Sequence, residues 1–262
     1  MSEILEAIDE RGVATITLNR PERHNAFDDA VIAALTGALR RLAADAAVRI
    51  VVLASSGRSF SAGADLEWMR RMATYSHEAN LADANALAAL MQTLDSLPKP
   101  TMALVQGAAF GGGVGLVASC DIVLASERAV FCLSEVKLGL TPATISPYVV
   151  RAMSARHARR YFQTAEIFGP AEAHAMGLVH EVVPAEALAE TAERIIDALL
   201  QGAPGAQAEA KALVTLCEET PIGGALMAET ARRIATQRTT AEGREGVGAF
   251  LAKRKPNWQV KS

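Results

Sequence analysis

A run of glycines, Gly111-Gly112-Gly113-Val114-Gly115, lies between a predicted strand and an apolar helical segment. Glycine has no Cβ atom, so a bound molecule can approach the backbone closely at such a run. The first turn of the helix that follows leaves unpaired N–H groups and a partial positive charge directed outward. The run therefore favours binding of an anion, or of an oxygen atom that gains negative charge during a reaction.

Two other interpretations of the glycine run remain. Residues 113–118 fit the letters of the G-x-G-x-x-A dinucleotide fingerprint, which begins where a strand ends and needs an acidic residue closing the next strand. Here the preceding strand is predicted to end near Val105, and the next one closes at Ala125-Ser126. Alternatively, the glycines serve only to let neighbouring segments pack closely.

A second segment of small residues, Ser59 to Asp65, follows a strand that is predicted to be buried. By itself the segment is typical of an ordinary loop between a strand and a helix, with Asp65 as the helix cap. Together with the glycine run it permits another prediction. We predict that the two loops, which both lie at strand ends and can both expose backbone N–H groups, converge on one oxygen atom.

Glu135 is the third candidate, because it lies in the largely apolar stretch from Phe131 to Leu140. Burial in such a stretch would raise the pKa of the carboxyl and let it exchange protons near neutral pH. The alternatives are a salt bridge to Lys137 and simple exposure to solvent.

The elements that must position these segments alternate between strand and helix. Strands are predicted at 4–8, 13–18, 50–53, 102–105 and 122–124, with helical stretches between several of them. After about Tyr148 strand signals nearly vanish, and amphipathic helices are predicted at 185–200, 206–217 and 224–236. This pattern predicts an α/β core over residues 1–200 and a helical C-terminal region over residues 201–262.

Composition narrows the class of protein. The 262 residues are 50% hydrophobic and 21% charged, which is typical of a folded globular chain. The net charge of −3 gives no electrostatic footprint for nucleic acid, so no nucleic-acid partner is expected. No histidine shows metal-ligand spacing, and no metal site is predicted.

The compartment is predicted from the cysteines and the hydropathy pattern. Three cysteines, Cys120, Cys132 and Cys217, lie in apolar surroundings without CxxC spacing and are interpreted as buried, reduced side chains. The acidic N-terminus lacks the features of a secretory signal, and no uncharged run approaches the ~20 residues that span a bilayer. We expect a cytoplasmic protein with no membrane partner.

Taken together, the segments resemble the enoyl-CoA hydratase/isomerase family, also called the crotonase superfamily. The resemblance covers almost the whole chain, and the order and spacing of the motifs carry it rather than any single one. The matching motifs are Leu18-Asn19-Arg20-Pro21, Asn25-Ala26, Phe60 to Asp65, Pro100-Thr101, Gly107, Gly111-Gly112-Gly113, Cys120-Asp121, Phe131 to Gly139, Gly177-Leu178-Val179 and Phe250 to Pro256.

The resemblance implies a crotonase-type fold, a spiral of stacked ββα units with a helical C-terminal region for oligomerisation. It implies that the N–H groups of Ala64 and Gly112 form an oxyanion hole and that Glu135 is the family's second catalytic glutamate. It also implies trimers or pairs of trimers. The residues that it implies for binding an acyl-CoA substrate are Arg23, His24, Ala26, Ala62, Asp65, Leu66, Gly111, Phe250 and Lys253.

The chain departs from the family's pattern at two places. Hydratases of the family usually carry a first glutamate two positions beyond the glycine triplet, where this chain has Gly115. The family's glycine-rich stretch after the second glutamate is replaced by Thr141 to Tyr148. Both features look like the bacterial branch assigned to 3-methylglutaconyl-CoA and isohexenylglutaconyl-CoA hydratases, whose substrates carry a second carboxylate. We hypothesise that this carboxylate, or the hydroxyl of Thr144 or Ser146, positions the water.

The resulting prediction is an enoyl-CoA hydratase that adds water reversibly to an α,β-unsaturated acyl-CoA. No metal or redox cofactor is required, because enolate stabilisation and proton transfer suffice for this reaction. Coenzyme A arrives as part of the substrate. One alternative is an enoyl-CoA double-bond isomerase, which needs a single carboxylate. Another is a member of the family that binds acyl-CoA or RNA without catalysis.

Overall fold

The structure, a computed structural model that describes residues 3–259, contains two β-sheets. The larger sheet has the strand order β1-β2-β3-β5-β7-β9. Strand β1 pairs antiparallel with β2, and every later pair is parallel. The bounds of its strands are Ile4–Ile8 (β1), Val13–Leu18 (β2), Ile50–Ser55 (β3), Thr101–Val105 (β5), Ile122–Ser126 (β7) and Glu181–Val183 (β9).

A second, smaller sheet is fully parallel and has the order β4-β6-β8. Its strands have three residues each: Ser59–Ser61 (β4), Ala108–Phe110 (β6) and Val130–Cys132 (β8). Each one follows a strand of the larger sheet and precedes a helix. The chain therefore repeats a strand-strand-helix unit three times, and the predicted fold of stacked ββα units is confirmed.

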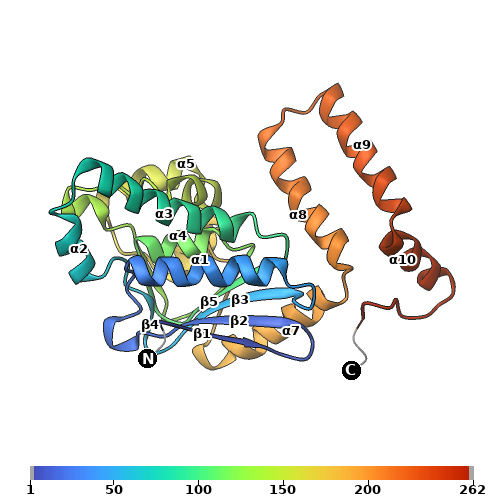
Figure 1. Ribbon diagram of the computed structural model, residues 1–262, viewed down its shortest axis with the longest axis horizontal. Coiled ribbons are helices and arrows are strands. Elements are labelled where there is room, and N and C mark those ends of the chain that lie inside the picture. Colours follow the sequence, from blue (N-terminus) through green and yellow to red (C-terminus); the bar gives the residue numbers. More distant parts are fainter. Residues whose placement is uncertain (1–2, 260–262) are drawn as a thin grey trace. The chain divides into compact units, whose positions relative to one another are not determined.

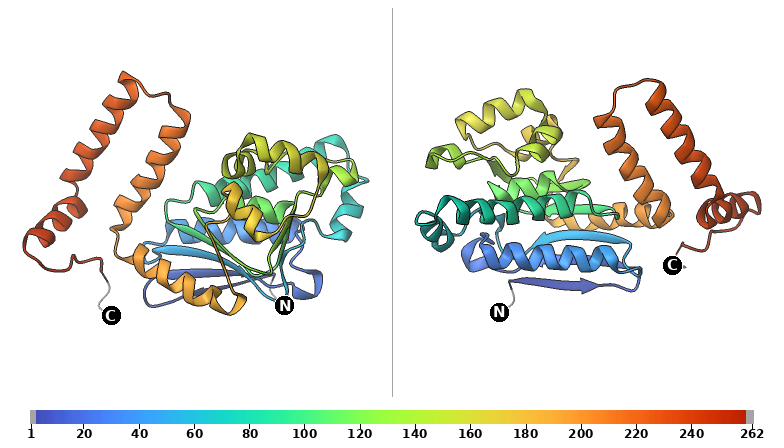
Figure 2. Two further views of the ribbon diagram at one scale, coloured as in Figure 1. Left: turned by 180° about the vertical axis from the view of Figure 1, so that it is seen from behind. Right: turned by 45° about the horizontal axis from the view of Figure 1, so that its top comes forward.

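The helices that follow the small strands are α2 (Leu66–Met72) and α3 (His77–Asp95) after β4, and α4 (Gly112–Ala118) after β6. After β8 comes a short 3₁₀ helix, η2 (Glu135–Leu138), and then α5 (Ser146–Thr164). Helix α1 (Asp29–Ala44) lies between β2 and β3, where Asp28 caps it by accepting a hydrogen bond from the N–H of Val31. Helices α1 and α3 pack against each other beside the larger sheet (Figures 1 and 2).

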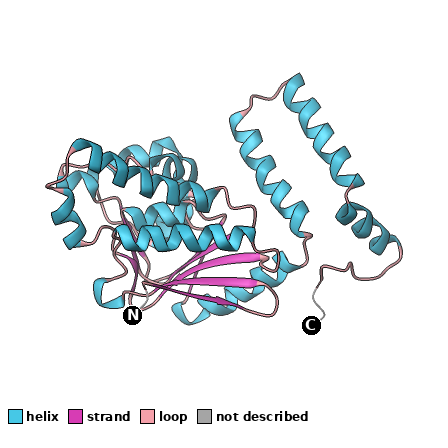
Figure 3. Cartoon of the chain, in the orientation of Figure 1, coloured by secondary structure: helices cyan, strands magenta, loops and turns pink. Residues whose placement is uncertain are grey.

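The chain divides into two compact units, residues 1–97 with 101–193, and residues 98–100 with 194–262. All described strands belong to the first unit (Figure 3). Its last elements are α6 (Pro170–Met176), β9, η3 (Ala185–Ala187) and the start of α7 (Leu188–Leu200). The second unit continues α7 and contains α8 (Pro204–Glu219), α9 (Gly224–Thr239) and α10 (Ala241–Leu251).

Polar contacts hold the second unit together internally. The carboxylate of Glu242 on α10 accepts hydrogen bonds from the N–H groups of Gly205 and Ala206, and so caps the N-terminus of α8. Cys132 is buried and Cys120 is partly buried, whereas Cys217 on α8 is exposed, so the expectation of three buried cysteines was wrong for Cys217. None of the helices in residues 3–259 is both long and apolar enough to cross a membrane.

Candidate active site

Three loops leave the carboxyl ends of the small sheet side by side. Residues 62–64 follow β4, Gly111 and Gly112 follow β6, and residues 133–135 follow β8. Because the three strands are parallel and adjacent, their carboxyl ends meet at one edge of the sheet. The three segments that the sequence singled out are therefore neighbours, although Ala64 and Glu135 are far apart in the chain.

Glycines bring the first two loops into contact. A Cβ atom on Gly63 would lie 3.1 Å from the carbonyl oxygen of Phe110, and one on Gly111 would lie 4.0 Å from the Cα atom of Gly63. Both glycines have positive φ, 89° and 51°, a conformation that other residues rarely adopt. A Cβ atom on Gly111 would also lie 3.2 Å from Oε1 of Glu135. The two loops and the carboxyl group of Glu135 thus meet around Gly111.

The backbone around Ala64 is fixed by a short parallel bridge to Phe27. The N–H of Phe27 donates to the carbonyl of Gly63 at 2.7 Å, and the N–H of Asp65 donates to the carbonyl of Phe27 at 2.7 Å. Successive N–H groups of an extended segment point to opposite sides. The N–H of Ala64 consequently points away from Phe27, and within residues 3–259 it has no backbone acceptor.

The N–H of Gly112 is also unengaged within the described chain, because Gly112 is the first residue of α4. The preceding N–H, that of Gly111, donates to the carbonyl of Cys132 on β8. A side chain on Gly112 would meet the ring of Phe27 at 2.8 Å, so Phe27 supports both loops. Two free N–H donors thus border the same edge, and their convergence on one oxygen atom stays a prediction.

Glu135 is partly buried at the start of η2. Burial raises the pKa of its carboxyl group, and a hydrogen bond from its own backbone N–H opposes that rise without cancelling it. Its buried Oε2 atom has no hydrogen-bond partner in residues 3–259. The ammonium of Lys137 instead donates to the carbonyl of Ala165 at 2.8 Å, which removes the alternative of a salt bridge between Lys137 and Glu135.

No side chain can occupy the space next to Gly115. A Cβ atom there would lie 2.3 Å from Cγ2 of Ile145 and 3.2 Å from Cε of Met91. Ile145 is fully buried and belongs to the segment that departs from the family's pattern. The place at which the family usually has its first glutamate is therefore filled by an apolar side chain from another loop.

The hydroxyl groups of Ser146 and Thr144, both considered for holding the water, differ in their hydrogen bonds. Ser146 donates its hydroxyl proton to the carbonyl of Ala143 at 2.8 Å. Thr144 is partly exposed and precedes Ile145, whose side chain adjoins Gly115 of α4. No hydrogen bond engages its hydroxyl within residues 3–259, so Thr144 is the freer donor of the two.

The loop from Arg23 to Ala26 is tied to the segment that leads into Ala64. His24 and Asn25 both have positive φ, and the carbonyl of His24 accepts the N–H of Ala62 at 2.9 Å. The amide of Asn25 donates to the carbonyl of Ser59 at 2.9 Å, and Ser61 Oγ donates to the carbonyl of Asn25 at 2.8 Å. Hydrogen bonds therefore join the two loops that carry Arg23, His24, Ala26, Ala62 and Asp65, which the resemblance implies for binding the substrate.

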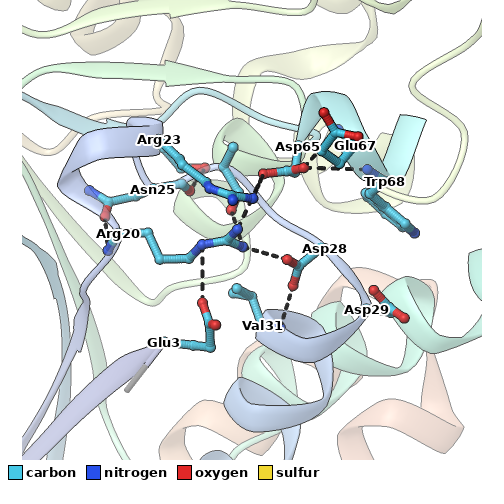
Figure 4. A network of polar contacts seen from close by, with 12 residues as sticks. Glu3, Arg20, Arg23, Asn25, Asp28, Asp29, Val31, Asp65, Glu67 and Trp68 are labelled. Atoms are coloured by element: carbon cyan, nitrogen blue, oxygen red, sulfur yellow. Dashed lines mark hydrogen bonds and ion pairs between the residues drawn. The ribbon is translucent and has the colours of Figure 1, made fainter. Parts of the chain in front are cut away.

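Asp65 lies within a network of charges that centres on Arg20 (Figure 4). Oδ1 of Asp65 accepts the N–H groups of Glu67 and Trp68 and so caps α2, while Oδ2 accepts Arg20 at 3.2 Å and Arg23 at 3.1 Å. Burial alone would raise the pKa of Asp65, but these hydrogen bonds and the charge of Arg20 outweigh it and lower the pKa. Asp65 is confirmed as a helix cap.

The remaining predicted residues occupy different surroundings. Ala26 is buried, whereas the side chain of Leu66 is 70% exposed on the first turn of α2. Phe250 and Lys253 belong to the second unit, where α10 ends, and Phe250 is 82% exposed. Next to Lys253, the guanidinium of Arg254 pairs with Glu245. The contributions of Phe250 and Lys253 to a site stay predictions.

Three residues of the site escaped the sequence analysis as functional candidates: Arg20, Phe27 and Ile145. Arg20 stood in a motif of the family resemblance, but nothing in the sequence indicates that its guanidinium is buried among carboxylates. Phe27 follows Ala26 directly and reads as an ordinary core residue. Among residues 3–259 no His, Cys, Asp and Glu side chains form a group of three or more that could hold a metal ion.

Comparison with known proteins gives consistent matches along the chain. Residues 9–261 match the family model for enoyl-CoA hydratase/isomerase. A crystal structure of an enoyl-CoA hydratase from Shewanella pealeana is 46% identical, with a TM-score of 0.95 and coverage of 98% of this chain and 96% of that one.

Two curated relatives carry different activities in their names. Enoyl-CoA hydratase AKT6-1 of Alternaria alternata is 37% identical over 255 residues, which cover 95% of this chain and 82% of the relative. The 1,2-epoxyphenylacetyl-CoA isomerase of Escherichia coli is 32% identical over 264 residues and covers all of both chains.

Proposed function

Because this chain belongs to the enoyl-CoA hydratase/isomerase family, we propose that it catalyses the reversible addition of water to an α,β-unsaturated acyl-CoA. One observation carries the proposal. Glu135 has a raised pKa and an oxygen without a hydrogen-bond partner, and its carboxyl group lies beside Gly111. The next residue, Gly112, has an N–H that donates to no acceptor in the described chain.

In the proposed reaction the thioester oxygen accepts hydrogen bonds from the N–H groups of Ala64 and Gly112. These bonds strengthen as the oxygen gains enolate character, and loss of one such donor costs about 2.7–4 kcal/mol of transition-state stabilisation. The oxygen of water bonds to the β-carbon as the π bond between the α- and β-carbons opens, the proton that the water loses passes to Glu135, and Glu135 delivers one proton to the α-carbon. Glu135 thus ends the cycle in the protonation state in which it began. Addition of water causes no net change of oxidation state, so the proposed reaction needs no redox cofactor. The two N–H donors supply the charge stabilisation at the thioester oxygen, so the proposed reaction needs no metal ion.

The surroundings of Gly115 support a reaction with a single carboxyl group. Ile145 fills the space beside Gly115, so a second protein carboxylate at that position has no room. The attacking water then needs another partner. We propose that the substrate's own distal carboxylate, as in 3-methylglutaconyl-CoA, holds the water together with the hydroxyl of Thr144.

Double-bond isomerisation is the second candidate, and the same observation favours it. An isomerase needs one carboxyl group to take a proton from one carbon and return it to another, and Glu135 alone meets that need.

The test is a turnover assay in ¹⁸O-labelled water with 3-methylglutaconyl-CoA, crotonyl-CoA and a β,γ-unsaturated acyl-CoA. The proposal expects ¹⁸O in a 3-hydroxyacyl product, with faster turnover of the substrate that carries the distal carboxylate. Migration of the double bond without ¹⁸O incorporation would establish the isomerase instead. Equal hydration of methylglutaconyl-CoA and crotonyl-CoA would reject the role of the distal carboxylate.

A further inference from the structure

The carboxylate of Asp65 is fully used inside the protein. Asp65 is only 5% exposed, and its two oxygens accept four hydrogen bonds. Two of these come from backbone N–H groups at the start of α2, and two come from Arg20 and Arg23. A carboxylate engaged in this way holds neighbouring backbone in place, and it has little capacity left for contacting a substrate.

Arg20 is the fixed point of this network. Its side chain is 9% exposed, and its guanidinium also pairs with Asp28 at 2.6 Å and with Glu3 at 3.0 Å (Figure 4). It donates in addition to the carbonyl of Ala26 at 3.3 Å, and its backbone N–H donates to Oδ1 of Asn25 at 2.8 Å. A planar guanidinium held by several acceptors has little rotational freedom, so Arg20 gives Asp65 a defined position.

Ala64 immediately precedes Asp65 in the chain. On one side of Ala64, the carbonyl of Gly63 accepts the N–H of Phe27. On the other side, Asp65 is fixed through both its backbone N–H and its carboxylate. The Ala64 N–H lies in the same peptide plane as the Gly63 carbonyl, and the next peptide plane ends at Asp65. A displacement of Asp65 would therefore change the φ and ψ angles of Ala64 and move this donor.

From these contacts we infer that Asp65 and Arg20 are positioning residues, which hold the Ala64 N–H in the direction required to receive the thioester oxygen. This inference rests on the proposed oxyanion role of Ala64. An oxyanion donor acts at about 2.7–3.1 Å from the charged oxygen, and a displacement of about 1 Å can lower the rate by roughly 10²-fold. Anchoring of this peptide by buried charges therefore bears directly on turnover.

Asp65→Asn is the main test variant. The asparagine oxygen can still cap α2, but its NH₂ group cannot accept hydrogen bonds from Arg20 and Arg23. Asp28→Asn is the matched control, because Asp28 also pairs with Arg20 and also caps a helix, α1. The control thus alters the same guanidinium through a carboxylate that does not adjoin Ala64.

The primary readout is the absorption of an aryl-substituted enoyl-CoA bound to each variant. Hydrogen bonds to the carbonyl oxygen of such a conjugated thioester stabilise its polar excited state and shift its absorption to longer wavelength. We expect Asp65→Asn to lose most of this shift and to lower kcat about 10- to 100-fold, with KM changed less than about threefold. Asp28→Asn should keep the shift and stay within about threefold of the wild-type kcat.

Several outcomes overturn the inference. It fails if Asp65→Asn keeps the full shift, or if both variants lose kcat equally. If Asp65→Asn does not fold, Arg20→Lys provides the test, since lysine keeps the charge but cannot bond Asp28 and Asp65 with one planar fork. A folded Arg20→Lys variant with wild-type shift and kcat would also reject it. Absence of the shift in the wild-type protein would reject the oxyanion role itself, which is a separate result.

Discussion

Two carboxyl groups follow the two outer strands of the same three-stranded sheet, and their surroundings are opposite. Asp65 follows β4 and accepts four hydrogen bonds, which lower its pKa. Glu135 follows β8, has a buried oxygen without a partner among the described residues, and has a raised pKa. The protein satisfies the hydrogen-bonding capacity of Asp65, whereas one oxygen of Glu135 keeps an unused acceptor within residues 3–259.

Asp65 and Glu135 are expected to have different roles, Asp65 in holding the backbone and Glu135 in the reaction. A buried charge whose hydrogen bonds are complete fixes the backbone around it but gains nothing from a ligand. A buried carboxyl that lacks a partner costs folding free energy, and such a cost is typical of functional positions. We therefore expect changes at Asp65 and Glu135 to affect stability in opposite directions and activity through different steps.

The largest effect is expected from Glu135→Gln. Glutamine has nearly the same shape but cannot transfer a proton, so kcat should fall by about 10²- to 10⁴-fold. Binding of the acyl-CoA should be retained, because the N–H donors of Ala64 and Gly112 are unchanged. Stopped-flow turnover together with calorimetric binding measures both quantities. Retention of more than a tenth of the wild-type kcat would indicate that Glu135 is not the proton-transfer group.

Asp65→Asn and Glu135→Gln should shift stability with opposite signs at neutral pH. Loss of charged hydrogen bonds should destabilise Asp65→Asn by about 1.5–3 kcal/mol. Removal of a desolvated, unpartnered carboxylate should stabilise Glu135→Gln by about 0.5–2 kcal/mol. Urea unfolding of the three proteins at pH 7.5 measures the signs, and two shifts of equal sign would contradict the comparison.

The pH dependence of these differences follows from the directions of the pKa shifts. The folded pKa of Asp65 lies below its ordinary value of 3.8, so its stabilisation is complete above that value and is lost as pH falls through the folded pKa. The folded pKa of Glu135 lies above its ordinary value of 4.5, so its cost is absent below 4.5 and grows as pH rises through the folded pKa. The advantage of Glu135→Gln should therefore disappear below about pH 4.5 in a urea titration.

A substitution at Gly115 tests whether Ile145 leaves no room for a second carboxylate near Glu135. Gly115→Ala should destabilise the protein by about 1–3 kcal/mol, because the new methyl group would overlap Ile145. Gly248→Ala in α10 is the matched control, since a Cβ atom there would meet nothing within 4 Å. Alanine favours a helix more than glycine does, so the control should gain about 0.5–1 kcal/mol. Thermal unfolding compares the two, and a neutral Gly115→Ala would show that the space is not filled.

The smallest effect is expected at Thr144, proposed to help hold the water in place of that carboxylate. Thr144→Val keeps the shape but removes the hydroxyl, and hydration should slow by about tenfold, the equivalent of one hydrogen bond. Binding of a saturated acyl-CoA should not change, because no water is added to it. Thr144→Ser serves as the control and should restore hydration. Unchanged hydration by Thr144→Val would leave the water to the substrate's carboxylate alone.

Much of the large sheet could be predicted from the sequence, because its strands are apolar runs of adequate length. Asp65 was also recognisable as a helix cap from its position. The small sheet was not predicted. Segments such as Ser59–Ser61 and Ala108–Phe110 are three residues long and contain small side chains, so their pairing depends on the neighbouring units. The structural repeat left no fixed period in the sequence, since two helices follow β4 and one follows β6.

The candidate site likewise has parts that could be predicted from the sequence and parts that could not. The three segments that carry Ala64, Gly112 and Glu135 could be chosen from residue types and the family resemblance. The partnerless oxygen of Glu135 could not, because Lys137 lies two residues away and only the fold directs it to Ala165. The overlap between Gly115 and Ile145 likewise depends on a contact between distant parts of the chain. Sequence identifies the chemical groups, whereas their satisfaction is decided by tertiary contacts.

The most direct test of the account is the carbonyl stretch of a ¹³C-labelled enoyl-CoA thioester bound to Glu135→Gln, measured by isotope-edited infrared spectroscopy. This variant binds the substrate without converting it, so the ground-state carbonyl can be observed. Two backbone donors at Ala64 and Gly112 should weaken the C=O bond and move its band to lower frequency than in water. A band at the aqueous frequency or above would show that these N–H groups do not hold the thioester oxygen, and would contradict the account.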